Sequence, residues 1–289
     1  MDKDLQDLIR ISNEVGRDPE LVQGGGGNTS VKTGDGLMYV KASGTALGEM
    51  KEGKGYRCVD AEECLEILDN EEVAAMEPAP RETEVTRLMT ESCVDDLPGR
   101  PSVETSLHAL LGRCVVHTHP SLVNGILCAR DSREVIEELF GDFSPPVLYI
   151  EYTDFGYPLA CKVREAVEDY RRKHERLPVL TFLENHGLFV STEDADEALE
   201  LTAEVTETIR KAWNEKAGQV HERHGKTVGR LEEVEIVSDV CVTLRRLYED
   251  ILGVPVLVRY GVGTSVQRFL SHPHCEELIQ CGPLVPDQV

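Results

Sequence analysis

The chain of 289 residues is poor in positive charge: 30 lysines and arginines stand against 53 aspartates and glutamates, for a formal net charge of -23. Proteins that bind nucleic acids or anionic membranes set Lys and Arg against a dense array of phosphates. A surface this negative repels such arrays. We therefore expect neither a nucleic acid nor a membrane surface as a partner.

The chain also lacks a long apolar run. No stretch approaches the roughly 20 apolar residues that a helix needs to span a bilayer, and no basic start is followed by an apolar segment. The nine cysteines are scattered, odd in number and without a Cys-x-x-Cys pair. This pattern is typical of reduced, mostly buried thiols. We expect a cytoplasmic protein that is neither secreted nor inserted in a membrane.

Two common phosphate-binding motifs are missing. The sequence contains no Gly-x-x-x-x-Gly-Lys-Ser/Thr, and no Gly-x-Gly-x-x-Gly that follows a strand and opens a long helix. This argues against a P-loop and against a dinucleotide site of the usual kind. The remaining composition is ordinary, with 40% hydrophobic and 29% charged residues. Such a chain can bury a core, and its length suits one large domain or two modest ones.

Apolar spacing predicts an α/β protein. A helix is expected from Leu5 to Val15, with Gly16 as its stop, and then a glycine loop leads into a hairpin of strands 30–32 and 37–41. Further strands are expected at 114–117, 147–150, 179–183 and 188–190, and further helices at 104–111, 120–129, 158–171 and 193–215. This alternation predicts helices packed on one central sheet.

The composition changes after residue 215. The segment 216–229 is polar and has no sustained apolar period, which predicts a linker or a helix end. Beyond it, a small α+β extension is expected over 230–289: a helix from about Leu231 to Leu252, strands near 256–259 and 267–270, and a short helix at 273–280. We therefore divide the chain into a main domain (1–215), a linker (216–229) and an extension (230–289).

Three histidines and one glutamate are placed to share a metal ion. His117 and His119 end an apolar run and would face the same side of a strand, because side chains repeat every second residue. His186 ends another apolar run, where a strand of the same sheet would stop. Three histidines leave coordination positions open, as catalytic zinc requires. Glu104 could complete the ligand set or act as a base beside the metal.

The other histidines do not end apolar strands. Most lie in polar segments and are expected at the surface: His174, His221, His224, His272 and His274. His108 lies one turn from Glu104 on the same expected helix. We expect it to pack there or to support a ligand rather than to bind a metal itself.

Several small and polar residues could bind a phosphate. Glycine-rich turns let backbone N–H groups approach an anion because no Cβ intervenes, and a helix N-terminus adds partial positive charge. The candidates are Gly27 and Asn28 in the glycine loop, Ser43 and Gly44 where a strand is expected to run into a short helix, and Ser102. Lys41 and Arg113 are the cations nearest to these segments, and the sequence assigns neither to the site.

Five ordered motifs together resemble the class II aldolase/adducin family over roughly residues 5–215. They are Gly-Asn-Thr-Ser (27–30), Lys-Ala-Ser-Gly (41–44), Pro-Ser-Val-Glu (101–104), His-Thr-His-Pro (117–120) and Asn-His-Gly (185–187). The resemblance implies a three-layer α/β/α sandwich with a largely antiparallel central sheet. It also implies, commonly, a homotetramer with its sites at subunit interfaces.

The resemblance further implies a role for each candidate residue. Zn²⁺, or Mn²⁺ or Co²⁺ in its place, would be held by His117, His119 and His186, with Glu104 as acid and base. The phosphate pocket would comprise Gly27, Asn28, Ser43, Gly44 and Ser102.

Two segments, Pro-Ser-Val-Glu-Thr and Gly-Pro-Leu-Val-Pro-Asp, are most similar to the aldolase part of bifunctional rhamnulose-phosphate aldolase/alcohol dehydrogenase proteins. The chain also departs from the family pattern. Sugar-phosphate aldolases usually have Ser-Ser before the acidic residue, whereas Val103 replaces the second serine here. Fuculose-phosphate aldolases use a tyrosine after the His-x-His segment as proton donor, and neither Tyr152 nor Tyr157 aligns with it. Family epimerases have Asp where this chain has Glu104, which favours an aldolase or a dehydratase.

The function that these features predict is a reversible, metal-dependent cleavage of a ketose 1-phosphate to dihydroxyacetone phosphate and an aldehyde. One alternative is a dehydration, decarboxylation or epimerisation of a related phosphorylated sugar at the same metal site. Another is a non-catalytic interaction module of the adducin kind. The sequence does not name the sugar.

Overall fold

The computed structural model describes residues 2–221 and 272–280. The chain divides between Glu215 and Lys216 into two compact units, and all features described below, apart from the end of one helix and a short C-terminal helix, belong to the first. Among the described residues, no helix is long and apolar enough to cross a membrane.

A single seven-stranded sheet forms the middle of the first unit, in the order β3-β2-β1-β4-β7-β6-β5. The strands are β1 (Asn28–Lys32), β2 (Leu37–Lys41), β3 (Tyr56–Asp60), β4 (Cys114–Thr118), β5 (Leu148–Ile150), β6 (Leu180–Leu183) and β7 (Gly187–Thr192). All neighbouring pairs are antiparallel except β5 with β6. The expectation of a largely antiparallel central sheet is confirmed.

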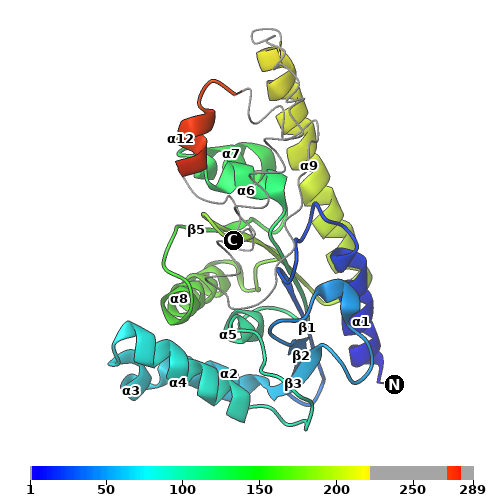
Figure 1. Cartoon of the computed structure of the whole chain (residues 1–289), viewed down its shortest axis with the longest axis vertical. Coiled ribbons are helices and arrows are strands. Elements are labelled where there is room, and N and C mark those ends of the chain that lie inside the picture. Colours follow the sequence, from blue (N-terminus) through cyan, green and yellow to red (C-terminus); the bar gives the residue numbers. More distant parts are fainter. Residues whose placement is uncertain (1, 222–271, 281–289) are drawn as a thin grey trace, which may run out of the picture. The chain divides into compact units, whose positions relative to one another are not determined.

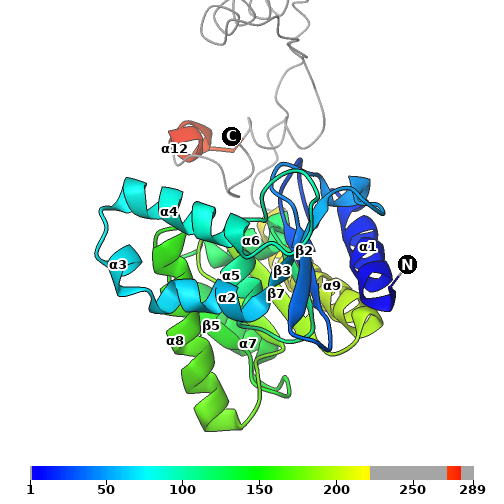
Figure 2. The same ribbon diagram turned by 90° about the horizontal axis from the view of Figure 1, so that it is seen from below.

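Helices cover both faces of this sheet (Figures 1 and 2). One core joins the sheet to α1 (Lys3–Gly16), α6 (Ser121–Leu127), α7 (Ser132–Phe140) and α9 (Ala195–His221). A second core joins the other face to α3 (Glu71–Ala74), α4 (Pro78–Glu91), α5 (Thr105–Ala109) and α8 (Tyr157–His174). A smaller core packs α2 (Ala61–Glu66) and α5 on β2 and β3. The predicted three-layer α/β/α sandwich is therefore confirmed.

The side-chain alternation of β4 decides which layer receives the site. Cys114 and Val116 belong to the core with α1 and α9, whereas Val115 belongs to the core with α5 and α8. Because the strand period is two, His117 follows Val115 onto the α5 side. All five residues of β4 are buried, so this imidazole leaves water when the chain folds.

The predicted elements before residue 215 are present, and the hairpin of β1 and β2 follows the glycine loop as expected. The sequence analysis did not identify β3, α2, α3, α4 or α7. These helices are short or rich in charged residues, and α3 has only four residues, so their apolar periodicity is weak.

The last part of the chain is described only in places. α9 continues beyond residue 215 to His221, so the first residues of the expected linker are helical. The short helix expected at 273–280 corresponds to α12 (Cys275–Gln280). The expected helix 231–252 and the strands 256–259 and 267–270 lie outside the described residues.

The cysteines fit the prediction of reduced thiols in part. The seven described cysteines are all free, but only Cys58, Cys64 and Cys114 are buried, and Cys128 is exposed. Burial raises the pKa of the Cys64 thiol to about 12. The buried thiols are therefore protonated, unreactive parts of the core.

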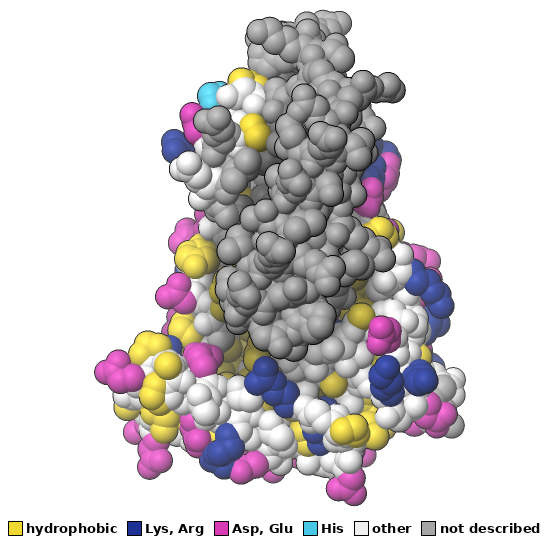
Figure 3. Space-filling view, in the orientation of Figure 1, with side chains coloured by type: hydrophobic (Ala, Val, Ile, Leu, Met, Phe, Trp, Pro, Cys, Tyr) yellow, Lys and Arg dark blue, Asp and Glu magenta, His cyan; other side chains and the backbone are white. Residues whose placement is uncertain are grey.

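Acidic and basic side chains are interspersed over the described part of the face in Figure 3.

Lys32 fastens the C-terminal end of α5 to strand β1. Its Nζ donates to the carbonyl oxygens of His108 (3.0 Å) and Gly112 (2.9 Å) and to that of Leu111. The last carbonyls of a helix have no partner within the helix, and a cation also suits the negative end of the helix dipole. Burial lowers the pKa of Lys32 to about 8, so the amine is still mostly charged at pH 7. Since Glu104 directly precedes α5, this anchor fixes the helix next to the carboxylate.

Replacing Lys32 with methionine should lower the free energy of unfolding by about 2 kcal/mol, because the carbonyls lose a charged donor that nothing replaces. Urea unfolding at pH 7 would measure this. Lys54→Met is the matched control, since the Lys54 side chain is 56% exposed and forms an ion pair with exposed Glu49. We expect this control to change stability by less than about 0.5 kcal/mol. Equal effects of the two variants would contradict the anchoring role of Lys32.

Candidate active site

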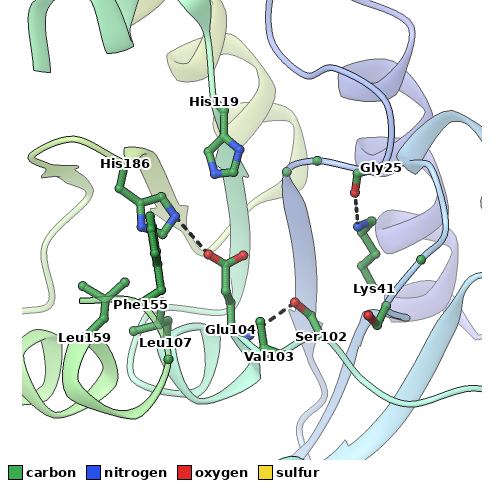
Figure 4. Close-up of a pocket in the computed structure, with 15 residues that line it drawn as sticks. Gly25, Lys41, Ser102, Val103, Glu104, Leu107, His119, Phe155, Leu159 and His186 are labelled. Atoms are coloured by element: carbon green, nitrogen blue, oxygen red, sulfur yellow. Dashed lines mark hydrogen bonds and ion pairs between the residues drawn. The ribbon is translucent and has the colours of Figure 1, made fainter. Parts of the chain in front are cut away.

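Four side chains predicted from the sequence converge in the structure. One ligand atom from each of Glu104, His117, His119 and His186 lies within 4.8 Å of the others. The Nε2 atom of His117 is 2.8 Å from that of His119 and 3.2 Å from that of His186. Glu104 Oε1 lies 3.0 Å from His186 Nε2 (Figure 4). The same oxygen lies 3.3 Å from His117 Nε2. Three imidazole nitrogens and one carboxylate oxygen form a donor set that could hold a metal ion.

Strand pairing brings the histidines together. His117 lies in β4, and His119 follows one residue after the strand ends. His186 lies in the tight turn between β6 and β7, next to Asn185, which has a positive φ of 56°. Because β4 pairs with β7 and Thr118 is opposite Leu188, this turn lies beside the end of β4.

Gly187 permits the close approach of the turn to β4. A Cβ at this position would lie 2.5 Å from Thr118 O, 2.8 Å from His119 Cδ2 and 3.2 Å from His117 Cε1. Any side chain would therefore push the two imidazoles and the strand end away. The glycine after His186 is a packing requirement of the cluster.

Two neighbours orient the His117 ring. Its Nδ1 lies 3.0 Å from the carbonyl oxygen of Leu188, which can only accept, so Nδ1 carries the proton and Nε2 keeps its lone pair. The ring also stacks on Phe189, its cross-strand partner, with centroids 3.9 Å apart and planes 14° apart. The nitrogen available to a metal is thus the one that faces Glu104.

The ionisation states also favour metal binding. Burial lowers the pKa of the His117 imidazole to about 4, against the opposing effect of Glu104. Burial alone would raise the pKa of the Glu104 carboxyl, but the imidazoles of His117 and His186 hold it well below its usual range. At neutral pH His117 is therefore neutral and Glu104 ionised. Those are the forms in which imidazoles and carboxylates bind metal ions.

The cluster opens into a pocket that has two chemically different parts (Figure 4). The polar part is lined by Gly25, Gly26, Gly27, Lys41, Ser43, Gly44 and Ser102. The part at the cluster is lined by Glu104, His119 and His186 together with Val103, Leu107, Phe155, Gly156 and Leu159. The structure therefore brings four of the five predicted phosphate residues into one pocket with His119, His186 and Glu104.

Asn28 is the fifth predicted phosphate residue, and it does not line this pocket. It is fully buried in β1 opposite His117, where its Oδ1 accepts from Thr29 N and its Nδ2 has no partner among the described residues. A short helical element follows Gly44, as expected. It is a single 3₁₀ turn, η1 (Leu47–Glu49), and so short an element adds little dipole.

Lys41 is the main residue that the sequence analysis left unassigned. Its side chain is buried in the pocket wall, and Nζ donates to Gly25 O at 2.7 Å. Among the described residues that line the pocket, it supplies the one Lys or Arg charge. Its position at the start of the Lys-Ala-Ser-Gly motif could have indicated that Lys41 belongs to the pocket. Arg113 lies elsewhere and binds Asp4 and Asp7 on α1.

Glu104 lies just before α5. The sequence analysis had placed it within the helix. A turn holds it: Ser102 Oγ accepts from Glu104 N at 3.2 Å, and Ser102 N donates to Lys41 O at 3.1 Å. The loop that carries Glu104 is thereby fastened to the end of β2. Val103, in the position of a second serine, is 54% exposed and lines the pocket.

The remaining histidines largely match the prediction. His108 is fully buried and packs as expected, with Nδ1 2.8 Å from Ser30 Oγ. Its ring meets that of Phe189 edge-on, with the two ring centroids 5.5 Å apart. His272 and His274 are exposed, as expected, whereas His174 is half-buried against Tyr170. The side chains of His221 and His224 lie outside the described residues.

Phe155 is a second pocket residue that the sequence analysis missed. It follows β5, is 51% exposed, and its ring centroid lies 5.2 Å from that of His186.

Neither tyrosine considered as a proton donor lines the pocket: the Tyr152 hydroxyl bonds to Asp154 and the Tyr157 hydroxyl to Leu68 O. The described residues of this chain therefore assign no tyrosine to that role.

The sequence and the fold both match known proteins. Residues 6–213 match the family described as Class II Aldolase and Adducin N-terminal domain. The chain belongs to this family. The N-terminal class II aldolase domain of a conserved protein from Thermoplasma acidophilum is 25% identical, with a TM-score of 0.59 over 73% of this chain and 94% of that chain. A structure of L-fuculose 1-phosphate aldolase shares the fold at 18% identity, with a TM-score of 0.51 over 83% of this chain and 96% of that chain.

One curated relative is a longer protein than this chain. The uncharacterized oxidoreductase YuxG from Bacillus subtilis (strain 168) is 24% identical over 99% of this chain. The match covers 41% of that protein, so the chain spans about two fifths of the length of this relative.

Replacing Gly187 with alanine should disrupt the cluster of this family member, because the added Cβ displaces His119 and the end of β4. We expect affinity for added Co²⁺ or Zn²⁺ to fall by at least about tenfold, the scale of effects that misorient ligands. Equilibrium dialysis would measure the affinity. Gly34→Ala, in an open turn where a Cβ meets nothing within 4 Å, is the control and should bind like the wild type. Unchanged affinity in the Gly187 variant would refute this packing argument.

Proposed function

We propose that the protein is a zinc-dependent class II aldolase that reversibly cleaves a ketose 1-phosphate to dihydroxyacetone phosphate and an aldehyde. The observation that carries this proposal is one pocket that joins the cluster of Glu104 and the histidines to a polar wall with Lys41. A substrate with a phosphate at one end and a carbonyl on the next carbon suits both parts of this pocket.

The donor set supports a zinc ion, with Mn²⁺ or Co²⁺ as possible replacements. Imidazoles and carboxylates are common ligands of Zn²⁺, and burial of the three rings holds their nitrogens in place. His117, His119 and His186 would hold the ion. When bound, the ion would act as a Lewis acid on the substrate carbonyl.

Glu104 is the acid and base in this proposal. Its carboxylate is ionised at neutral pH, lies beside the three imidazoles and lines the pocket, so it can contact both the metal position and the substrate. In the synthetic direction Glu104 would remove a proton from C3 of dihydroxyacetone phosphate. In the cleavage direction the C4 hydroxyl would lose its proton to solvent as the C3–C4 bond breaks, and Glu104, once it has taken up a proton from solvent, would protonate C3.

The polar wall would bind the phosphate. Lys41 supplies charge, Ser43 and Ser102 supply hydroxyl donors, and the glycines let backbone N–H groups approach the phosphate oxygens. Val103 takes the place of a further hydroxyl and makes the wall less polar beside Glu104. Binding at this remote end would orient the reacting carbons over the cluster.

The comparisons support a wider context for the aldolase unit. A relative that carries the name oxidoreductase is more than twice as long as this chain, which matches 41% of it. This fits the proposal that the unit is of the type found in bifunctional rhamnulose-phosphate aldolase/alcohol dehydrogenase proteins, and that residues 1–215 are its catalytic domain. The intact donor set favours an enzyme over a non-catalytic module.

We further propose a cytoplasmic homo-oligomer, with a tetramer favoured. Val103, Tyr152 and Phe155 are large apolar side chains with about half of their surface exposed, and two of them line the pocket. Exposed apolar side chains beside a pocket are typical of surfaces that a partner covers. The free cysteines among the described residues fit a reducing compartment.

The variant Glu104→Gln should keep bound zinc, because three imidazoles remain, and should lose aldol cleavage by about 10²-fold to 10⁴-fold. Zinc content and dihydroxyacetone phosphate release from a panel of ketose 1-phosphates would be measured on the same samples. Glu91→Gln, a surface position 60% exposed, should leave both unchanged. Full cleavage by the zinc-loaded Glu104→Gln variant would contradict the proposed acid–base role of Glu104. Failure of the zinc-loaded wild type to cleave any ketose phosphate would contradict the proposed function.

Replacing Lys41 with methionine should raise KM for the phosphorylated ketose by about 10-fold to 100-fold, because the phosphate loses its charged partner. Initial rates should be compared for the ketose 1-phosphate and the same ketose without phosphate. Lys54→Met is the control. The effect should be confined to the phosphorylated substrate. An equal loss on both substrates would mean that Lys41 serves only to hold the glycine loop through Gly25.

A further inference from the structure

The turn that carries His186 is held by a helix as well as by its own strands. Asn124 on α6 donates from Nδ2 to the carbonyl oxygen of His186 at 2.8 Å. A second hydrogen bond, from Asn185 N to Leu127 O at 3.2 Å, joins the same turn to the same helix. The His186 backbone is therefore tied to α6 at two points.

The helix α6 is also the continuation of the segment that carries the other two imidazoles. It begins at Ser121, two residues after His119, and Asn124 N donates to Pro120 O at 2.9 Å in its first turn. Asn124 thus lies five residues after His119 in the chain, and its side chain is hydrogen-bonded to the backbone of His186. Its amide fixes the distance between two segments far apart in sequence.

Burying the Asn124 amide costs free energy unless its polar atoms form hydrogen bonds. Asn124 is fully buried, and its Oδ1 has no hydrogen-bond partner in the described structure. His186 Nδ1 is likewise buried and without a partner. A buried polar atom without a partner costs about 1–3 kcal/mol, so complementary atoms on two residues that are already bonded to each other call for an explanation.

The chemistry of a metal ligand supplies one. When Nε2 gives its lone pair to a metal ion, the proton of a neutral imidazole must be on Nδ1, which is then a buried donor in need of an acceptor. His117 has such an acceptor in Leu188 O. For His186, the amide that already holds its backbone carries an unused acceptor oxygen.

We propose that Asn124 is a positioning residue of the metal centre. Its Nδ2 sets the place of the His186 backbone relative to His119, and its Oδ1 accepts the Nδ1 proton of the metal-bound His186 ring, directly or through one water. Asn124 does not line the pocket, so it acts through His186 and not on the substrate. The inference rests on the proposed metal binding and extends it beyond the four ligands.

The test is metal binding and not activity. Asn124→Leu keeps the number of side-chain atoms and removes both hydrogen-bonding groups, and Asn124→Ala is the second variant if the leucine does not fit. The matched control is Asn13→Leu: Asn13 Nδ2 also bonds two backbone carbonyls, Ile9 O at 2.7 Å and Met50 O at 2.8 Å, but on α1 and not at the cluster. Affinity would be measured by competition with a chelator, and ligand geometry by the absorption spectrum of bound Co²⁺.

We expect the Asn124 variants to bind Zn²⁺ and Co²⁺ about 10-fold to 100-fold more weakly and to change the Co²⁺ spectrum. Asn13→Leu should lose thermal stability but keep the wild-type affinity and spectrum. Unchanged affinity and spectrum in whichever Asn124 variant folds would overturn the inference, as would an equal loss of affinity in Asn13→Leu. A wild-type protein that binds neither metal would instead overturn the proposed function itself.

Discussion

The antiparallel pairing of β4 with β7 is the constraint on which the rest of the site depends. It places the end of β4 beside the turn before β7, and so joins His117 to His186, which are 69 residues apart in sequence. The approach is so close that only glycine fits at position 187. Burial then acts on the assembled groups: it lowers the pKa of His117, while the imidazoles of His117 and His186 hold the pKa of Glu104 well below its usual range. Strand register thus determines both the geometry and the charge of the cluster.

The second determinant is how the loops close around the cluster. The turn with Ser102 and Glu104 is bonded to the end of β2, and Lys41 at that strand end is bonded to the glycine loop. These bonds bring a local positive charge into a protein whose net charge is -23. An acidic surface and recognition of a phosphate are compatible because buried donors act over a few ångströms, where solvent and salt screen them little.

The sequence predicted most of the fold and the four side chains of the cluster, for physical reasons that can be named. Strand alternation places His117 and His119 on one face, and apolar runs mark the ends of β4 and β6. It missed Lys41 as a pocket residue and Phe155 beside His186, since each acquires its place only when a loop folds back on the sheet. It placed Glu104 on a helix, whereas the turn before α5 holds it.

By itself, the sequence determined the class of the protein: five ordered motifs, a donor set of three histidines and a glutamate, and an alternation of strands and helices that predicts a layered sheet. These features are local, because side-chain period and residue chemistry depend on near neighbours. Tertiary structure alone decided that the donors meet within 4.8 Å, that Lys41 rather than Arg113 faces the pocket, and that Asn124 holds His186. Those contacts join distant segments, and only the register of the strands and the packing of α6 bring them together.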